Sequence, residues 1–408
     1  MNALIVGAKY NNMRYDVDSS LEELIALCEA CDILVSKQCV QNLDKIQSST
    51  FIGKGKVFEI KEQLDDIDIV IFDEELTPLQ VKNLTDILEI EVTDRTDLIL
   101  RIFESRAKTK EAKLQVSIAK NQYLLPRLAG MQEHMSHQQG GSGFRGSGEK
   151  QIELDRRVIH NQLHHAKLQL QHIVKQRQTQ RKRRKENGMK VIALVGYTNS
   201  GKSTLLNAMC QNKEKRVFEQ DMLFATLETA TRHITIKNHN CLLTDTVGFI
   251  DRLPHHLVQA FRSTLEEVQE ADVLIHVIDS SNDEYQKCVD TTNEVLKSLQ
   301  ADQIPMIYVY NKIDKNRYGW IQPQDPHVFI SAKDKSNLDT LEDMISRVLF
   351  KEYAVYELNI PYQDGEIYKY LEQHCTILHR EYLEDTVYLK IEAHPSFIHH
   401  YQQYLLKH

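Results

Sequence analysis

Residues 196–203 have the sequence Gly-Tyr-Thr-Asn-Ser-Gly-Lys-Ser, which matches the phosphate-loop pattern G-x-x-x-x-G-K-[ST]. An apolar run at 191–195 precedes the motif and a helical pattern follows it, which is the context that such a loop requires. There, backbone N–H groups and the helix dipole bind phosphate oxygens. We predict that Lys202 reaches the β- and γ-phosphates and that the Ser203 hydroxyl ligates Mg²⁺. The predicted phosphate-contacting residues are Gly196, Tyr197, Thr198, Asn199, Ser200, Gly201, Lys202, Ser203 and Thr204.

A second pair of motifs identifies the base. Asn311-Lys312-Ile313-Asp314 follows an apolar strand, and Ser331-Ala332-Lys333 follows the next strand. The Asp314 carboxylate can accept hydrogen bonds from guanine N1–H and N2–H₂, whereas adenine lacks both donors and would leave the carboxylate unpaired. The backbone N–H of Ala332 is expected to meet guanine O6. We therefore predict GTP and GDP as ligands, with the base contacted by Asn311, Lys312, Ile313, Asp314, Ser331, Ala332 and Lys333.

Two segments between these motifs have residue types that respond to a γ-phosphate. Asp245-Thr246-Val247-Gly248 ends an apolar strand, so Asp245 is expected to hold Mg²⁺ through water and the Gly248 N–H to meet the γ-phosphate. Upstream, Phe224-Ala225-Thr226 offers Thr226 as the Mg²⁺-ligating threonine, with Thr229 and Thr231 as alternatives. Both segments would be ordered by the γ-phosphate and released on hydrolysis. We therefore predict a GTP hydrolase, and its predicted catalytic residues are Lys202, Thr226 and Gly248.

Two neighbours of these motifs bear on the rate of hydrolysis. Phe249 stands where many GTPases place a water-orienting Gln, and a phenyl ring cannot orient water by hydrogen bonding. We therefore expect slow intrinsic hydrolysis, completed by an outside group, although a Phe that only packs behind the segment is an equal alternative. Asn199 stands where potassium-activated GTPases also carry Asn, so K⁺ beside the phosphates is one hypothesis and an Asn that only shapes the loop is the other.

The motifs lie in a regular alternation of strands and helices from residue 189 onward. Strands are predicted near 190–196, 233–237, 241–245, 272–279, 305–311 and 327–331, and helices near 202–210, 255–270, 283–299 and 337–349. This alternation predicts a mostly parallel sheet with helices on both faces, as in a Ras-like P-loop GTPase domain at 189–350. Strand patterns at 354–360 and 386–391 around a helical stretch predict a small C-terminal α/β domain at 351–408.

An N-terminal α/β domain is predicted at 1–97. Apolar runs at 3–6, 33–35 and 69–72 are expected to be strands. Ser20-x-x-Glu23 is taken as a capping box that opens one helix, and Thr77-Pro78 opens another. This domain has no phosphate loop, and whether it binds an adenine nucleotide stays open.

A basic helical hairpin is predicted at 98–188. These residues include 19 Lys and Arg against 7 Asp and Glu, a net charge of +12, so the rest of a chain with a net charge of −8 carries −20. Apolar residues at three-, four- and seven-residue steps predict two long antiparallel helices, joined by a Gly-rich tip at 140–148. The charge favours a nucleic-acid partner, with a solvated helical pair and a plain connector as alternatives. The predicted RNA-contacting residues are Arg145, Arg181, Lys182, Arg183 and Arg184.

The amino-acid composition and the distribution of apolar residues indicate the cellular compartment of the protein. No apolar run approaches the ~18 residues of a membrane span, and the first residues lack the pattern of a signal peptide. The seven cysteines are scattered, as expected for reduced thiols, and Cys28-x-x-Cys31 alone is a weak metal motif. We expect a cytoplasmic monomer, with partial membrane association left open.

Four segments together resemble the HflX family of ribosome-associated GTPases, namely 194–205, 223–227, 243–250 and 260–267. The likeness covers about residues 1–350. It implies a GTPase that binds the large subunit of the 70S ribosome, with the basic hairpin on ribosomal RNA, and that couples GTP binding and hydrolysis to ribosome dissociation or rescue. A GTPase in subunit assembly or RNA modification, and a nucleotide-gated RNA-binding scaffold, are the alternatives.

Overall fold

The structure is a computed structural model of the chain. It describes residues 1–11, 13, 15–138, 147–186, 189–210, 224, 230–252, 257, 267–315 and 321–406, with the backbone alone at 129–138, 147–152, 178, 180–186 and 373–374. Arg145, Ala225, Thr226 and Thr229 lie outside the described residues, as do the side chains of the basic cluster at 181–184. The chain forms two compact units: unit 1 comprises 1–175, 220–228 and 251–263, and unit 2 comprises 176–219, 229–250 and 264–408.

Unit 1 is built on a four-stranded parallel sheet with the strand order β2-β1-β3-β4. The strands are β1 (Asn2–Tyr10), β2 (Leu34–Leu43), β3 (Ile69–Phe72) and β4 (Glu91–Asp94). Leu34 and Val35 of the apolar run at 33–35 thus begin a strand of ten residues, and β4 is a strand that the apolar pattern did not predict. Alternate β1 residues face opposite sides, because Leu4 and Val6 pack with one pair of helices while a Cβ at Gly7 would meet Leu21 of another.

Helices cover both faces of this sheet. They are α1 (Val17–Glu29), α2 (Lys54–Lys61), α3 (Pro78–Leu88) and α4 (Arg95–Arg106). The capping box predicted at Ser20 and Glu23 is wrong: Asp16 caps α1 by accepting from the Ser19 N–H, and Ser20 lies inside the helix. The prediction at Thr77 is confirmed, since its hydroxyl caps α3 and Gln80 completes the capping box.

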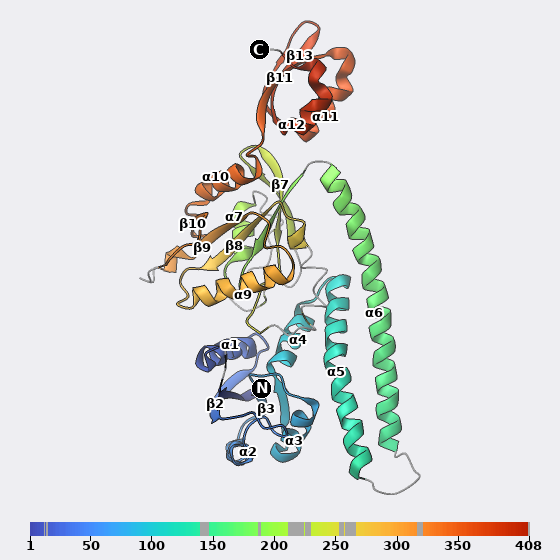
Figure 1. The fold of residues 1–408 in the computed structure, drawn as a ribbon, viewed down its shortest axis with the longest axis vertical. Coiled ribbons are helices and arrows are strands. Elements are labelled where there is room, and N and C mark those ends of the chain that lie inside the picture. The colour runs from blue at the N-terminus through green and yellow to red at the C-terminus, as the bar shows by residue number, and fades with distance from the viewer. Residues whose placement is uncertain are drawn as a thin grey trace. The chain divides into compact units, whose positions relative to one another are not determined.

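Two long helices run antiparallel and side by side (Figure 1). They are α5 (Lys110–Gln138) and α6 (Ser147–Glu186), and α6 extends from unit 1 into unit 2. The first of the two long helices predicted at 98–188 is interrupted in the structure. The helix α4 ends at Arg106, and Ala107 adopts an extended conformation before α5 begins. Leu100 and Phe103 therefore belong to a separate helix, buried against the N-terminal sheet unit.

Unit 2 contains a six-stranded sheet with the order β10-β9-β8-β5-β7-β6, parallel except for the antiparallel β6–β7 pair. Alternate β5 residues face two cores: Ile192 and Leu194 pack with α7 and α10, while Ala193 and Val195 pack with α9. Of the four predicted helices, that at 255–270 lies mostly outside the described residues. The elements are β5 (Lys190–Val195), α7 (Lys202–Met209), β6 (Ala230–Ile236), β7 (His239–Asp245), β8 (Val273–Asp279), α9 (Tyr285–Ser298), β9 (Met306–Asn311), β10 (His327–Phe329) and α10 (Leu338–Leu349).

The C-terminal residues of unit 2 form a separate antiparallel sheet with the order β11-β13-β12. Its elements are β11 (Ala354–Pro361), α11 (Gly365–His374), β12 (Thr376–Tyr382), β13 (Thr386–Ala393) and α12 (Pro395–Ile398). The sequence pattern predicted β11 and β13 but missed β12, whose residues are mostly exposed. The predicted α/β class is thus confirmed for the chain.

None of the described helices is both long enough and apolar enough to cross a membrane. Among the described residues, no group of three or more His, Cys, Asp and Glu side chains is placed to hold a metal ion. Cys28 and Cys31 belong to the first unit, and burial raises the pKa of both thiols, to about 12 and about 11. Thiols of this kind stay protonated near neutral pH and are poor metal ligands.

Candidate nucleotide-binding site

The phosphate loop lies between the carboxyl end of β5 and the start of α7 in unit 2. Gly196 has a φ of 145°, and a Cβ there would lie 2.3 Å from the carbonyl oxygen of Val277. Only glycine can occupy this position, because an added Cβ would overlap the backbone of β8. The first glycine of the motif therefore lets the loop turn tightly over the neighbouring strand.

Lys202 is buried beneath the loop, where its ammonium donates to the carbonyl oxygens of Gly196, at 3.0 Å, and Tyr197, at 2.6 Å. Burial lowers the pKa of Lys202 to about 8, with the Lys312 charge adding to the effect and the Asp245 carboxylate opposing it. A desolvated ammonium of this kind favours an anionic ligand, because a negative charge beside it replaces the lost hydration.

The two predicted Mg²⁺ ligands of the phosphate loop and of β7 meet in the structure. The Ser203 hydroxyl donates to Oδ2 of Asp245 across 2.7 Å, and Asp245 is fully buried. A hydroxyl and a carboxylate are the oxygen donors that Mg²⁺ prefers, so the residues present fit this ion. Ser203 would hold Mg²⁺ directly and Asp245 would hold it through a water molecule.

Two further loop hydroxyls are arranged as a phosphate site would require. The Oγ1 of Thr198 and the Oγ of Ser200 are buried and have no hydrogen-bond partner among the described residues. Buried polar atoms are ordinarily hydrogen-bonded, because an unpaired one costs free energy. Phosphate oxygens, which are strong acceptors, would satisfy both hydroxyls.

The Asp245–Gly248 segment lies directly against the phosphate loop. The Thr198 N–H donates to the carbonyl of Phe249 at 2.7 Å, and the Phe249 N–H donates to the carbonyl of Gly196 at 3.1 Å. A Cβ at Gly248 would lie 2.9 Å from Thr198 and 3.1 Å from the Lys202 ammonium. Gly248 thus has no room for a side chain, and its backbone is close to where the γ-phosphate would bind.

The Phe249 ring supports the packing alternative. It is 2% exposed and lies in the core between the sheet and α9, with Ala193, Val268 and Leu296. The ring therefore anchors the chain behind the loop, and it offers no polar group that could orient the attacking water.

The first two residues of the Asn-Lys-x-Asp motif contact the phosphate loop. The Asn311 amide donates to the Ser200 carbonyl at 2.9 Å, and the Lys312 ammonium donates to the Asn199 carbonyl at 2.7 Å. Asp279, at the end of β8, pairs with Lys312 at 2.8 Å. Asp279 was missed from the sequence, although an acidic residue at the carboxyl end of a parallel strand is a recognisable signal.

The last residue of the motif is positioned for a base. Asp314 is exposed, and its Oδ1 accepts from the Ser331 hydroxyl at 2.7 Å. The Ala332 N–H donates to Oδ1 of Asn311 at 2.9 Å, so guanine O6 would share or replace this acceptor. Lys333 is exposed beside them. Ser331 thus orients the carboxylate that would recognise guanine.

The upstream segment is only partly described. Phe224 is 2% exposed and belongs to unit 1, where its ring packs edge-to-face on Phe103 at 4.7 Å between centroids. Its side chain is therefore a packing group, and a contact of the Phe224 backbone with nucleotide stays a prediction.

The two middle residues of the Asp245–Gly248 segment contact the protein itself. In unit 2 the Thr246 hydroxyl donates to the Leu194 carbonyl at 2.6 Å, and Val247 is buried.

Proteins in which a phosphate loop, an Asp-x-x-Gly segment and an Asn-Lys-x-Asp motif converge at the carboxyl edge of a mostly parallel sheet form the class of P-loop GTPases. Unit 2 has this construction. A family model described as a 50S ribosome-binding GTPase matches residues 191–312. Models described as the N-terminal and middle regions of GTP-binding GTPases match 18–104 and 106–184.

Proteins of similar sequence identify the family to which the chain belongs within this class. A GTPase HflX from Caldanaerobacter subterraneus subsp. tengcongensis is 42% identical over 381 residues, which cover 92% of this chain and 88% of that protein. The GTPase HflX of Escherichia coli is 37% identical over 384 residues, 90% of this chain and 88% of that one. The chain belongs to the HflX family of GTPases, and it is a GTP hydrolase.

A crystal structure of a GTP-binding protein from the archaeon Sulfolobus solfataricus, in complex with GDP, is also similar. It is 26% identical, covers 86% of this chain and 99% of that one, and has a TM-score of 0.44.

Proposed function

We propose that this GTPase binds the large ribosomal subunit within the 70S ribosome and couples GTP binding and hydrolysis to ribosome dissociation or rescue. The observation that carries the proposal is the strongly basic helical segment, with a net charge of +12 at 98–188, in a chain whose nucleotide domain matches a 50S ribosome-binding GTPase model. Such a factor would act in the cytoplasm, where it meets ribosomes.

In the proposed cycle, the phosphate loop binds GTP, and a Mg²⁺ ion held by Ser203 and, through water, by Asp245 would neutralise charge on the phosphates. Lys202 supplies the fixed cation, and the Gly248 N–H contacts the γ-phosphate. Thr226 is proposed as the second side chain, after Ser203, that would ligate the ion directly. Loss of the γ-phosphate removes the contact to Gly248 and releases both neighbouring segments.

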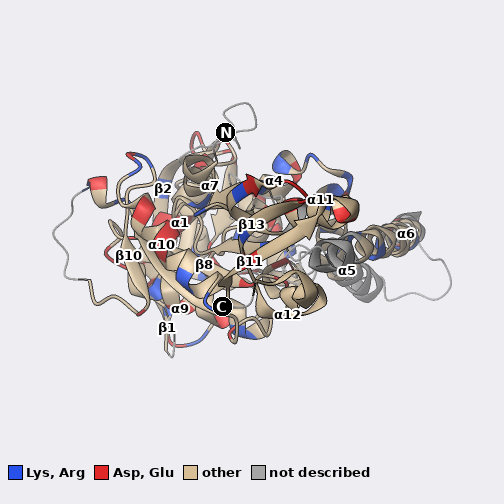
Figure 2. Cartoon of the chain, turned by 90° about the horizontal axis from the view of Figure 1, so that it is seen from above, with Lys and Arg blue, Asp and Glu red and all other residues tan. Residues whose placement is uncertain are grey.

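The charge of α6 supports an RNA partner. Its described side chains include five basic residues, Arg156, Arg157, Lys167, Lys175 and Arg177, against the two acidic residues Glu153 and Asp155. In Figure 2 the Lys and Arg residues are blue, and blue segments lie along α6. A long, exposed, basic helix can neutralise backbone phosphates without reading a sequence. The proposed contacts are strongest at the end of the helix, with Arg181, Lys182, Arg183 and Arg184, and at the tip, with Arg145.

The test is sedimentation of purified 70S ribosomes with the protein and a non-hydrolysable GTP analogue, GDP or no nucleotide. We expect co-sedimentation with the large subunit and conversion of 70S particles into subunits with the analogue only. A variant with residues 181–184 changed to alanine should bind ribosomes more weakly. In a plot of the logarithm of ribosome affinity against the logarithm of salt concentration, the slope should be shallower by about one for each lost phosphate contact.

A matched control removes four exposed lysines elsewhere, Lys54, Lys61, Lys297 and Lys351, so that the net charge changes equally. GTP binding by both free variants should equal that of the parent. Unchanged ribosome affinity and salt slope in the 181–184 variant would contradict the RNA contact. Binding without splitting would favour a role in subunit assembly or RNA modification, and full activity over repeated cycles with the analogue would favour a scaffold.

We also propose that a monovalent cation assists hydrolysis beside Asn199. Its carboxamide is exposed, makes no hydrogen bond to a described residue, and has a backbone φ of 59° within the phosphate loop. A cation held there would supply positive charge to the transition state, as an arginine finger does. GTP hydrolysis should be at least about tenfold faster in KCl than in NaCl at equal ionic strength, and Asn199→Ala should abolish the difference. Equal rates in the two salts would eliminate this cation.

A further inference from the structure

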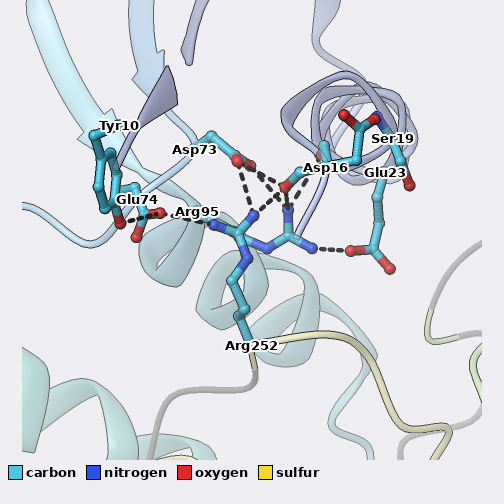
Figure 3. A network of polar contacts seen from close by, with 9 residues as sticks. Tyr10, Asp16, Ser19, Glu23, Asp73, Glu74, Arg95 and Arg252 are labelled. Carbon is cyan, nitrogen blue, oxygen red and sulfur yellow. Dashed lines mark hydrogen bonds and ion pairs between the residues drawn. The ribbon is translucent and has the colours of Figure 1, made fainter. Parts of the chain in front are cut away.

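A network of charged side chains lies at the carboxyl edge of the unit 1 sheet (Figure 3). Asp73 follows β3, and Arg95 follows β4. Nη1 of Arg95 pairs with Oδ1 of Asp73 at 2.9 Å, and Nη2 of Arg95 pairs with Glu23. In parallel α/β sheets this edge is where ligands ordinarily bind. Here it receives a side chain from a distant part of the same chain.

That side chain is Arg252. Its guanidinium donates to Oδ2 of Asp73 at 2.7 Å and to Oε1 of Glu74 at 3.1 Å, and it also contacts the Ser20 hydroxyl. It lies over the Tyr15 ring, 4.0 Å from the centroid. The Arg252 side chain is only 20% exposed. Two ion pairs, a hydroxyl and an aromatic face therefore fix one guanidinium in a largely water-free site.

The electrostatics of the network depend on Arg252. Burial alone would raise the pKa of Asp73, but the charges of Arg95 and Arg252 and the Ser20 hydroxyl outweigh it and hold this pKa below its ordinary value. Burial raises the pKa of Glu74, against the opposing charge of Arg252. Removing the Arg252 guanidinium would leave Glu74 without its nearest cation, whereas Asp73 would keep Arg95.

The position of Arg252 in the chain connects this network to the nucleotide site. Gly248 lies against the phosphate loop, and the Phe249 ring is buried in the core of unit 2. Only Ile250 and Asp251 separate that ring from Arg252, which belongs to unit 1 by its contacts. The backbone of Arg252 has a φ of 54°, a conformation that a non-glycine residue keeps only when its surroundings hold it there.

A second, independent contact of the same kind involves the upstream segment. Phe224 precedes the proposed Mg²⁺ ligand Thr226 by two residues, and its ring packs on Phe103 of α4 within unit 1. Phe224 and Arg252, one upstream and one downstream of Asp245–Gly248, thus both make side-chain contacts within unit 1.

We propose that Arg252 is a positioning residue for GTP hydrolysis. Its ion pairs with Asp73 and Glu74 hold the chain that follows Asp245–Gly248, and they thereby keep the Gly248 N–H where the γ-phosphate arrives. The inference rests on the proposed role of Gly248. In this proposal, the carboxyl edge of the unit 1 sheet binds the Arg252 side chain, and this binding supports GTP hydrolysis.

The experiment compares Arg252→Ala with the parent as full-length protein. The kcat for GTP hydrolysis should fall by about tenfold or more, because the reacting geometry is no longer held. The Kd for GDP should stay within about twofold, since GDP has no γ-phosphate for Gly248 to contact. Arg252→Lys keeps one ion pair and should be intermediate. A kcat that is unchanged or raised, or a loss of GDP affinity equal to the loss of rate, would overturn the proposal.

Control variants separate positioning from stability. Arg101→Ala removes an arginine of the same unit that pairs with Asp97 and Glu91, and it should leave kcat at the parent value. Glu74→Gln should reduce kcat on its own but add nothing to Arg252→Ala, because the pair is already broken. Additive losses, or a melting temperature that falls in step with kcat across all variants, would show a structural role only.

Gly248→Ala separates the role of Gly248 from the role of Arg252. The added Cβ would crowd Thr198 and the Lys202 ammonium, so hydrolysis should be lost if Gly248 acts as proposed. If Gly248→Ala hydrolyses GTP normally, the role of Gly248 fails. If it is inactive while Arg252→Ala keeps the parent kcat, only the positioning role of Arg252 fails.

Discussion

Replacing Asp314 by asparagine should convert the guanine site into one that prefers xanthine nucleotides. The carboxylate would accept hydrogen bonds from guanine N1–H and N2–H₂, and an asparagine amide would meet those donors with a donor of its own. Hydrogen bonds to a charged group contribute about 1.5–3 kcal/mol each, so losing two should weaken GTP and GDP binding by about a hundredfold or more. Xanthine carries an oxygen in place of the 2-amino group and would accept from the new amide.

The measurement is displacement of a fluorescent GDP by GTP, GDP and XTP. Folding should be preserved, because the asparagine oxygen can still accept from the Ser331 hydroxyl, which donates to Asp314 at 2.7 Å. Asp343→Asn is the matched control, since Asp343 is a surface partner of Lys237 in the same unit. If Asp314→Asn binds GTP as tightly as the parent and ignores XTP, the base site lies elsewhere.

Lys202→Ala should abolish most GTP binding and hydrolysis. The Lys202 ammonium is buried beneath the phosphate loop, where it would meet the β- and γ-phosphates, and charge-assisted hydrogen bonds to phosphate are about twice as strong as neutral ones. Losing about 3 kcal/mol or more would weaken GTP binding by at least about a hundredfold. The substitution also leaves the carbonyls of Gly196 and Tyr197 without their donor, so the loop itself should loosen.

Calorimetric titration with GTP in Mg²⁺, together with single-turnover hydrolysis, measures both effects. Lys237→Ala is the control, because Lys237 is half exposed and its ion pair with Asp343 is on the surface. Such pairs contribute at most about 1 kcal/mol, so its nucleotide affinity should match that of the parent. A Lys202→Ala protein that still binds GTP normally would show that the triphosphate does not lie in this loop.

Most of the six-stranded sheet of unit 2 could be predicted because four of its strands contain apolar runs between polar motifs. β5, β7, β8 and β9 are buried along most of their length, and continuous burial produces an apolar signal that needs no knowledge of neighbours. β12 and most of β2 were missed because exposed strands mix polar and apolar residues. Their pairing with an adjacent strand, which the sequence does not state, makes them strands.

Helix ends were predictable where one cap was available and failed where two competed. Thr77 with Pro78 and Gln80 was unambiguous. Near α1, both Asp16 and Ser20 are good caps, and the choice depends on where Ser20 is needed. Its hydroxyl donates to Oδ2 of Asp73 at 2.6 Å, a partner 53 residues away. A tertiary contact therefore decided a local boundary.

What the sequence by itself determined is the nucleotide class, because the phosphate loop binds phosphates with its own backbone and the Asn-Lys-x-Asp motif supplies the carboxylate that is predicted to select guanine. What the tertiary structure decided is everything that joins distant segments. Asn311 meets Ser200 across 111 residues, and Arg252 meets Asp73 across 179. No periodicity records such meetings, because they follow from the strand order and from how the helices pack. The packing of the Phe249 ring and the ion pairs of Arg252 with Asp73 and Glu74 can be known only from the folded structure.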